Sequence, residues 1–161
     1  MITIGIDPGI SGAIAVLCDD QLIAVHDMPV LEVKAGKTNK RQVSPQLLAD
    51  ILYGTALPKA NGVDCWLVLE KVGAMPGQGV TSMFNFGRSF GVVEGVAAGL
   101  GLGITYVTPQ VWQKRSGKKD GKDGSRQRVI ELYPSHADLF KRAKDDGRAD
   151  AVLIARYGMT G

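Results

Sequence analysis

The stretch that most constrains the fold is the start of the chain, MITIGIDPGISGAIAV, which runs from an apolar strand into a glycine-rich turn. Isoleucines alternate there with small or polar residues, and this period of two predicts a strand with one buried face. Asp7 lies at the end of the strand, on the opposite face. Gly9 and Gly12 allow a sharp turn and a close approach of other groups. The arrangement is typical of a site that binds a phosphate or a metal. A carboxylate that binds no ligand would have the same pattern.

The other apolar runs and turn signals predict an α/β fold with a mixed sheet. Apolar runs at 12–19 and 21–29 follow the first strand at 1–7, and Asp19-Asp20 between them predicts a hairpin. Further strands are expected at 64–72 and 104–109, and helices at 44–54, 80–100, 109–115, 125–134 and 146–158.

Composition narrows the class of protein. The chain has 161 residues, which fits a single domain over 1–161, and its 45% apolar and 22% charged content is ordinary for a globular protein. Cys18 and Cys65 lack metal-ligand spacing, which is typical of a reduced cytoplasmic protein. The sequence shows neither a signal-peptide pattern nor an apolar run of about 20 residues, so we expect no membrane span.

Positive charge is concentrated in two segments, although the net charge is only +3. The segment 32–42, expected to be a loop, has four basic residues and one glutamate. The segment 114–128 has two aspartates and seven basic residues, namely Lys114, Arg115, Lys118, Lys119, Lys122, Arg126 and Arg128. Such segments favour a polyanionic partner. A solvated loop that binds nothing has the same pattern.

Three carboxylates occupy positions where the predicted elements can bring them together. Asp7 ends the first strand, Glu70 ends the strand at 64–72, and Asp150 lies on the last helix. If the two strands are neighbours, Asp7 and Glu70 lie side by side and repel each other, and a divalent cation removes that repulsion. Oxygen ligands suit Mg²⁺ or Mn²⁺ rather than zinc. Each carboxylate alone fits a helix cap or a surface salt bridge, but the set indicates a metal site.

These motifs resemble those of the RuvC-type Holliday junction resolvases, within the ribonuclease H-like superfamily. IGIDPGISGAIA resembles the first motif of the family, LVLEKV the second, and RADAVLIA the last. The stretch GAMPGQGVTSMFNFGRSFGVVEGV is similar to the phage-type branch of the family.

The resemblance implies a fold, an activity and a set of site residues. The fold is a mixed five-stranded sheet, with a three-strand antiparallel meander and two parallel strands, flanked by helices. The activity is cleavage of four-way DNA junctions by a homodimer, with two Mg²⁺ ions per site for which Mn²⁺ substitutes. Asp7, Glu70 and Asp150 match the catalytic, metal-binding positions of the family, and the basic segments would bind DNA phosphates.

The sequence departs from the family pattern at two places. Many relatives have an acidic residue or histidine three positions before the final aspartate, where this chain has Gly147. Asp146 is our candidate fourth ligand, because on a helix it projects about 40° from Asp150 whereas Asp145 projects about 140° away. If Asp146 is instead an N-cap, the ligand set changes. The aromatic wedge of cellular relatives is also absent, since Gly73 and Met75 stand in that region.

Gly87, Gly91, Gly95 and Gly99 recur every four residues in the helix expected at 80–100. Each glycine destabilises a helix interior by about 1 kcal/mol relative to alanine, so a stripe of them calls for an explanation. A face without side chains allows close packing, either on the sheet of the same chain or on a partner such as a second copy.

Other functions share parts of this pattern. The first motif also resembles the phosphate-binding turn of actin-like ATPases, but those need two such subdomains and a chain of this length has one. Two alternatives remain open at this stage. One is a ribonuclease H-like nuclease acting on flap or RNA-containing substrates, and the other is a DNA-binding relative without catalytic activity.

Overall fold

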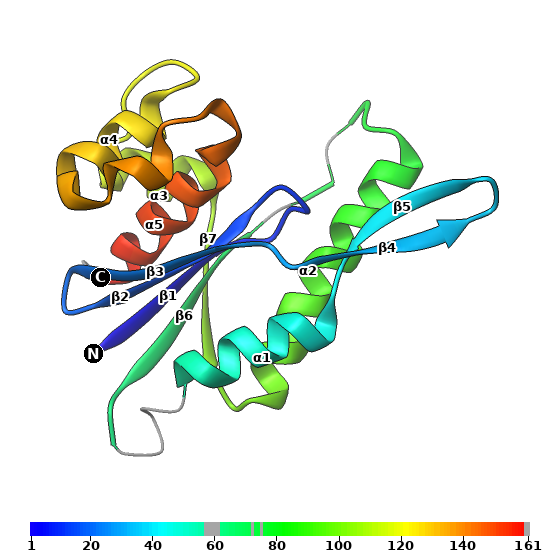
Figure 1. Cartoon of the computed structure of the whole chain (residues 1–161), viewed down its shortest axis with the longest axis horizontal. Helices are drawn as coiled ribbons and strands as arrows, with labels where there is room; N and C mark the ends of the chain where they lie inside the picture. Colours follow the sequence, from blue (N-terminus) through cyan, green and yellow to red (C-terminus); the bar gives the residue numbers. More distant parts are fainter. Residues whose placement is uncertain (57–61, 72, 75, 160–161) are drawn as a thin grey trace.

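The computed structural model describes residues 1–56, 62–71, 73–74 and 76–159 (Figure 1). Five strands form one mixed sheet in the order β3-β2-β1-β6-β7. Their bounds are β1 (Ile2–Asp7), β2 (Ala13–Cys18), β3 (Gln21–Asp27), β6 (Cys65–Glu70) and β7 (Gly103–Val107). The first three are antiparallel neighbours, whereas β6 runs parallel to both β1 and β7. The predicted mixed five-stranded sheet, with a meander and two parallel strands, is confirmed.

The turn between β2 and β3 is the predicted tight hairpin. Asp19 and Asp20 both have positive φ, at 44° and 68°. Two consecutive residues in this conformation match the right-handed twist of the flanking strands. Asp19 also accepts a hydrogen bond of 2.8 Å from the amino group of Met1, so the turn holds the start of β1.

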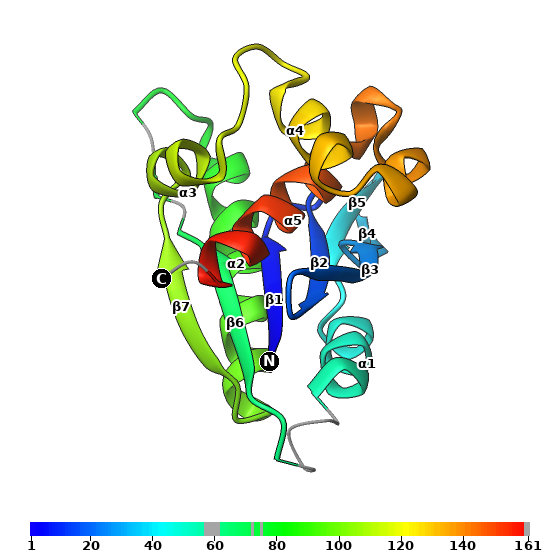
Figure 2. The same cartoon turned by 90° about the vertical axis from the view of Figure 1, so that its left-hand side faces the viewer.

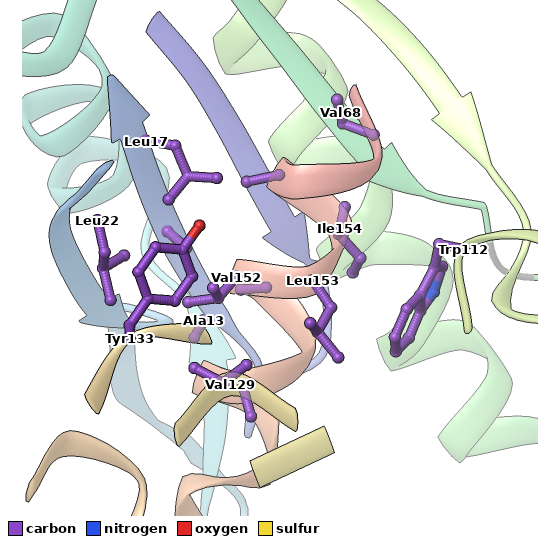
Figure 3. Packing of buried hydrophobic residues seen from close by; sticks show 14 of the residues in the cluster. Ala13, Leu17, Leu22, Val68, Trp112, Val129, Tyr133, Val152, Leu153 and Ile154 are labelled. Atoms are coloured by element: carbon purple, nitrogen blue, oxygen red, sulfur yellow. The ribbon is translucent and has the colours of Figure 1, made fainter. Parts of the chain in front are cut away.

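Helices cover both faces of the sheet (Figures 1 and 2). Helices α1 (Pro45–Ala56) and α2 (Val80–Gly99) pack on one face, where Ile4 and Ile6 of β1 are fully buried. The other face carries α3 (Pro109–Ser116), α4 (Gly124–Leu132) and α5 (Asp146–Met159). Figure 3 shows Leu153 and Ile154 of α5 in one cluster with Trp112. Within the described ranges, no helix is both long and apolar enough to cross a membrane.

Helix α5 lies unusually close to β1, because small residues face each other at the contact. A Cβ at Gly5 would lie 2.7 Å from the Cα of Ala155 and would also clash with the backbone oxygen of Ala151. The buried face of α5 is correspondingly small and apolar around these positions. This contact sets the distance between the last helix and the end of β1, where Asp7 lies.

Three segments differ from expectation. The loop expected at 32–42 is a two-stranded hairpin of β4 (Val30–Ala35) and β5 (Thr38–Val43), which extends away from the main sheet (Figure 1). Its turn includes Gly36 with a φ of 64°. The second strand, β5, is polar or charged from Thr38 to Gln42, so no apolar alternation marks it. Two 3₁₀ segments, η2 (Pro134–Phe140) and η3 (Ala143–Asp145), were not expected either.

The glycine stripe of α2 does not pack on the sheet. Gly87, Gly91, Gly95 and Gly99 are exposed, and a Cβ at any of them would meet nothing within 4 Å in the described part of the chain. The buried residues of this helix are Ser89, Val93 and Ala97. Of the two explanations offered by the sequence, packing on the sheet is therefore wrong for the residues that the structure describes.

Replacing Gly5 with alanine tests the close contact between α5 and β1. We expect Gly5→Ala to lower the free energy of unfolding by about 3 kcal/mol, since the added methyl overpacks a rigid backbone contact. Gly54→Ala in α1 is the matched control, because its Cβ enters open space. The control should raise stability by up to about 1 kcal/mol. Equal effects of both variants in urea denaturation would contradict the contact.

Candidate active site

Asp7 and Glu70 lie side by side at the carboxyl ends of adjacent parallel strands. The register pairs Ile6 of β1 with Leu69 of β6, and the two carboxylates follow immediately after. Asp150 joins them from α5, on the helix that packs across β1. The charge of Asp150 raises the pKa of both other carboxylates, which places all three in one electrostatic group.

The glycines of the first motif let the β1–β2 turn close around Asp7. A Cβ at Gly12 would lie 2.8 Å from the carboxyl carbon of Asp7 and would clash with its backbone oxygen. The amide of Gly9 donates a hydrogen bond of 3.3 Å to Asp7 Oδ1. On the outer side of the turn, a Cβ at Gly147 of α5 would lie 3.0 Å from the Cα of Gly12. Bare backbone on both sides therefore allows helix, turn and carboxylate to pack together.

Burial and mutual repulsion raise the pKa values of these carboxyl groups toward neutral pH. Burial raises the pKa of Asp7 to about 6, and the charge of Asp150 adds to the rise while the amide of Gly9 opposes it. Burial also raises the pKa of Glu70 to about 7, with further contributions from Asp7 and Asp150. The indole N–H of Trp112 opposes that rise by donating a hydrogen bond of 2.8 Å to Glu70 Oε1.

Asp150 carries an unsatisfied acceptor. Burial raises its pKa, and Ser125 and Lys118 counteract part of that shift. Its Oδ1 is buried and accepts no hydrogen bond in the described part of the chain. A buried carboxylate oxygen without a donor is costly unless a cation compensates it.

The donor set fits a divalent cation that prefers oxygen. Asp7, Glu70 and Asp150 offer only carboxylate oxygens, which are ligands for Mg²⁺ and Mn²⁺. The orphaned oxygen of Asp150 and the repulsion within the group would both be relieved by such an ion. Among the described residues, no three Asp, Glu, His or Cys side chains form a ready-made metal cluster. The carboxylates would therefore draw together on binding an ion.

Comparisons with known proteins agree with this architecture. No family model matches the chain. The structure of Thermus thermophilus RuvC superposes with a TM-score of 0.55 and 14% identity, covering 100% of this chain and 97% of that one. T. thermophilus RuvC in complex with a Holliday junction substrate gives a TM-score of 0.53 and 16% identity, covering 100% and 96%. The chain has the RuvC fold.

A curated protein also matches in sequence. The chloroplastic Holliday junction resolvase MOC1 of Chlamydomonas reinhardtii is 26% identical over 155 residues, which covers 85% of this chain. The match spans only 17% of the length of that relative. The likeness therefore concerns one region of a longer protein.

The two candidate fourth ligands have different surroundings within this RuvC fold. Asp146 has helical dihedrals at the start of α5. It is therefore on the same helix as Asp150, as the expected angle of about 40° between the two requires. Its Oδ1 accepts a hydrogen bond of 2.6 Å from Arg126 Nε. Asp145 is only 1% exposed and is bound by the backbone amide and guanidinium of Arg142. Burial opposes these bonds, but together with Arg148 they lower the pKa of Asp145.

Four of the seven basic residues in 114–128 are held by contacts within the chain. Lys119 pairs with Glu131, Arg126 with Asp123 and Asp146, Arg128 with Glu131 and the Ser116 carbonyl, and Arg115 lies over the ring of Tyr157. The side chain of Arg126 is only 11% exposed. In the described ranges, the other three form no ion pair: Lys114, Lys118 and Lys122.

Trp112, which is 1% exposed and donates a hydrogen bond to Glu70, was not expected from the sequence. A tryptophan at the start of a short helix that directly follows the last strand is the signal that could have found it, since a buried indole N–H needs an acceptor. Of the two residues in the region of the missing wedge, Gly73 is exposed and Met75 lies outside the described residues.

The raised pKa values predict how stability depends on pH. A carboxyl group with a raised folded-state pKa binds more protons folded than unfolded, so stability falls as pH rises toward that pKa. We expect Glu70→Gln to raise the free energy of unfolding by about 2 kcal/mol at pH 8 in chelator. The gain should shrink as pH falls from 7 toward 4.5. A gain independent of pH in denaturant titrations would show that Glu70 ionises normally.

Proposed function

We propose that residues 1–161 act as one structure-selective endonuclease domain that resolves four-way DNA junctions by metal-dependent phosphodiester hydrolysis. The observation that carries this proposal is the group of Asp7, Glu70 and Asp150 at one edge of a RuvC-fold sheet, with an orphaned oxygen on Asp150. The curated relative is a Holliday junction resolvase, and one structural neighbour was solved with a junction substrate. Both support junction DNA as the substrate.

Asp7, Glu70, Asp150 and the candidate Asp146 would hold two Mg²⁺ ions, with Mn²⁺ as a substitute. Such ions activate water and stabilise the leaving 3′-oxygen of a phosphodiester. The protein contributes orientation. The Gly9 amide orients Asp7, and the indole N–H of Trp112 orients Glu70. Arg126 holds Asp146, so this carboxylate would have to leave or share that guanidinium to join the others.

The three unpaired lysines of the 114–128 segment are our candidates for phosphate contacts. The charge of Lys118 lowers the pKa of Asp150, which supports a phosphate contact by this lysine on the side of the carboxylates. Lys114 and Lys122 are exposed. Cations of this kind position DNA without reading its sequence. The other basic residues of the segment would mainly hold its conformation through their contacts within the chain. They are Lys119, Arg126, Arg128 and Arg115.

Synthetic substrates test the activity directly. With Mg²⁺ we expect paired cuts in a four-way junction, and little cleavage of flap DNA or RNA–DNA hybrids. Asp7→Asn and Asp150→Asn should abolish cleavage and leave junction binding largely intact, because these groups hold metal rather than phosphate. Preferential cleavage of flaps or hybrids would replace the junction with another substrate. Binding without any cleavage would indicate a non-catalytic relative.

Substitution at the two neighbouring aspartates tests the fourth ligand. We expect Asp146→Asn to cripple cleavage with little loss of melting temperature, because its partly exposed pair with Arg126 is worth at most about 1 kcal/mol. Asp145→Asn should cleave nearly normally per folded molecule. It should nevertheless destabilise the protein by about 2 kcal/mol, since Asp145 is a buried, charge-paired acceptor. Inactivity of Asp145→Asn in fully folded protein would move the fourth ligand to Asp145.

The protein should be a homodimer that uses the exposed face of α2. The glycine stripe there is continued by Val80 and Phe84, which are 84% and 71% exposed. Two-fold symmetry suits the paired cuts of a junction. We expect dimers in sedimentation at micromolar concentration, and monomers for Gly95→Lys. Gly54→Lys, at an open glycine of α1, is the control. Monomeric wild-type protein, with and without a junction, would contradict the dimer.

A further inference from the structure

A second cationic surface lies beside the β1–β2 turn, apart from the 114–128 segment. A polar cleft of about 300 Å³ is lined by residues 10–12 of the turn, by Arg41 of β5, and by Arg142 and Lys144 around η3. Figure 1 shows the β4–β5 hairpin and the loop before α4 on different sides of this turn. The chain segments that meet here are far apart in sequence.

The acidic residues of the cleft are already neutralised. Asp27 accepts two hydrogen bonds from Arg148, at 2.6 Å from Nε and 2.7 Å from Nη2. Asp145 is bound by Arg142 at 2.9 Å, and Arg148 approaches it at 3.7 Å. The pairing lowers the pKa of both carboxyl groups, so both remain charged and occupied. Both carboxylates are therefore occupied by guanidinium groups and do not neutralise another cation of the cleft.

Arg41 and Lys144 are left without an acidic partner. Neither forms an ion pair in the described part of the chain, and both side chains are exposed at the cleft. Arg41 lies two residues before Val43, which is 1% exposed and anchors the backbone at the base of the same strand. Arg142 uses Nε and Nη2 on Asp145, and its Nη1 takes no part in those bonds. The cleft thus has a surplus of positive charge on ordered backbone.

The cleft also lies next to the catalytic carboxylates. Gly12 lines it, and a Cβ on this residue would lie 2.8 Å from the carboxyl carbon of Asp7. Lys118, which acts on the pKa of Asp150, belongs to the other basic surface. Cationic groups therefore flank the carboxylates on two sides.

We propose that Arg41, Lys144 and Arg142 bind a backbone phosphate of the DNA strand that is cut, next to the scissile position. The inference rests on the proposed nuclease function and adds a contact on the hairpin side of the site. The guanidinium fork suits phosphate oxygens, and phosphate contacts set the position of a strand without reading its sequence. A DNA strand whose phosphates are bound on both sides of Asp7 would lie against the carboxylates in one fixed register.

Salt dependence of binding tests the cleft. The probe is a four-way junction. An Arg41→Gln/Lys144→Gln double variant is compared with Lys141→Gln/Arg156→Gln, which removes the same charge at two positions outside the cleft and outside both basic segments. We expect the cleft variant to lower the slope of log affinity against log salt by about 0.9, the value for one lost phosphate contact. The control should leave the slope near that of the wild type. Equal slopes for both variants would overturn the inference.

Two further readings separate the possible failures. Wild-type protein that binds but does not cut junctions would refute the proposed function, while the slopes would still decide the cleft. Inorganic phosphate is the second probe. If it raises the melting temperature of wild-type protein but not of the cleft variant, and the DNA slopes are equal, the cleft binds a free anion and the inference is overturned. Shifted cut positions in the cleft variant would support the inference.

Discussion

Close packing of α5 on β1 is the contact on which the rest of the site depends. Gly5 of the strand faces Ala151 and Ala155 of the helix, and a single added methyl would collide with the helix backbone. The same helix presents Asp150 to the strand-end carboxylates and Gly147 to the β1–β2 turn. Any outward shift of α5 would therefore separate Asp150 from Asp7 and Glu70 together. Small residues at the contact bury less surface, but they allow α5 to lie close enough to bring Asp150 to the other carboxylates.

Much of the fold could be predicted from the sequence, because apolar alternation and turn chemistry are local. The adjacency of Asp7 and Glu70 followed from two strand ends in one parallel pair. The β4–β5 hairpin could not be predicted in this way, because its strands are largely exposed on both faces and show no buried stripe. The η2 and η3 segments depend on local hydrogen bonds that leave no long period in the sequence.

Charge was the least predictable property of the candidate site. Arg126 lies in a basic segment, yet its guanidinium binds Asp146, twenty positions later in the chain. Arg41 lies in a hairpin that also has Glu32 directly opposite it, yet it forms no ion pair in the described part of the chain. Contacts in the folded chain decide which basic side chain remains without an acidic partner. The neighbouring residues in the sequence do not show those contacts. Trp112 was missed for the same reason, since its acceptor lies on β6.

Both ends of the described chain lie away from the carboxylates. Met1 precedes β1 and is held by Asp19, while the site lies at the other end of that strand. Gly158, near the end of α5, lies against Thr3, and a Cβ there would be 3.1 Å from the threonine methyl. A strand of this length spans about 20 Å. Polypeptide joined at either end would leave the fold on its far side, so this fold can be embedded in a larger protein without obstructing the edge where the carboxylates lie.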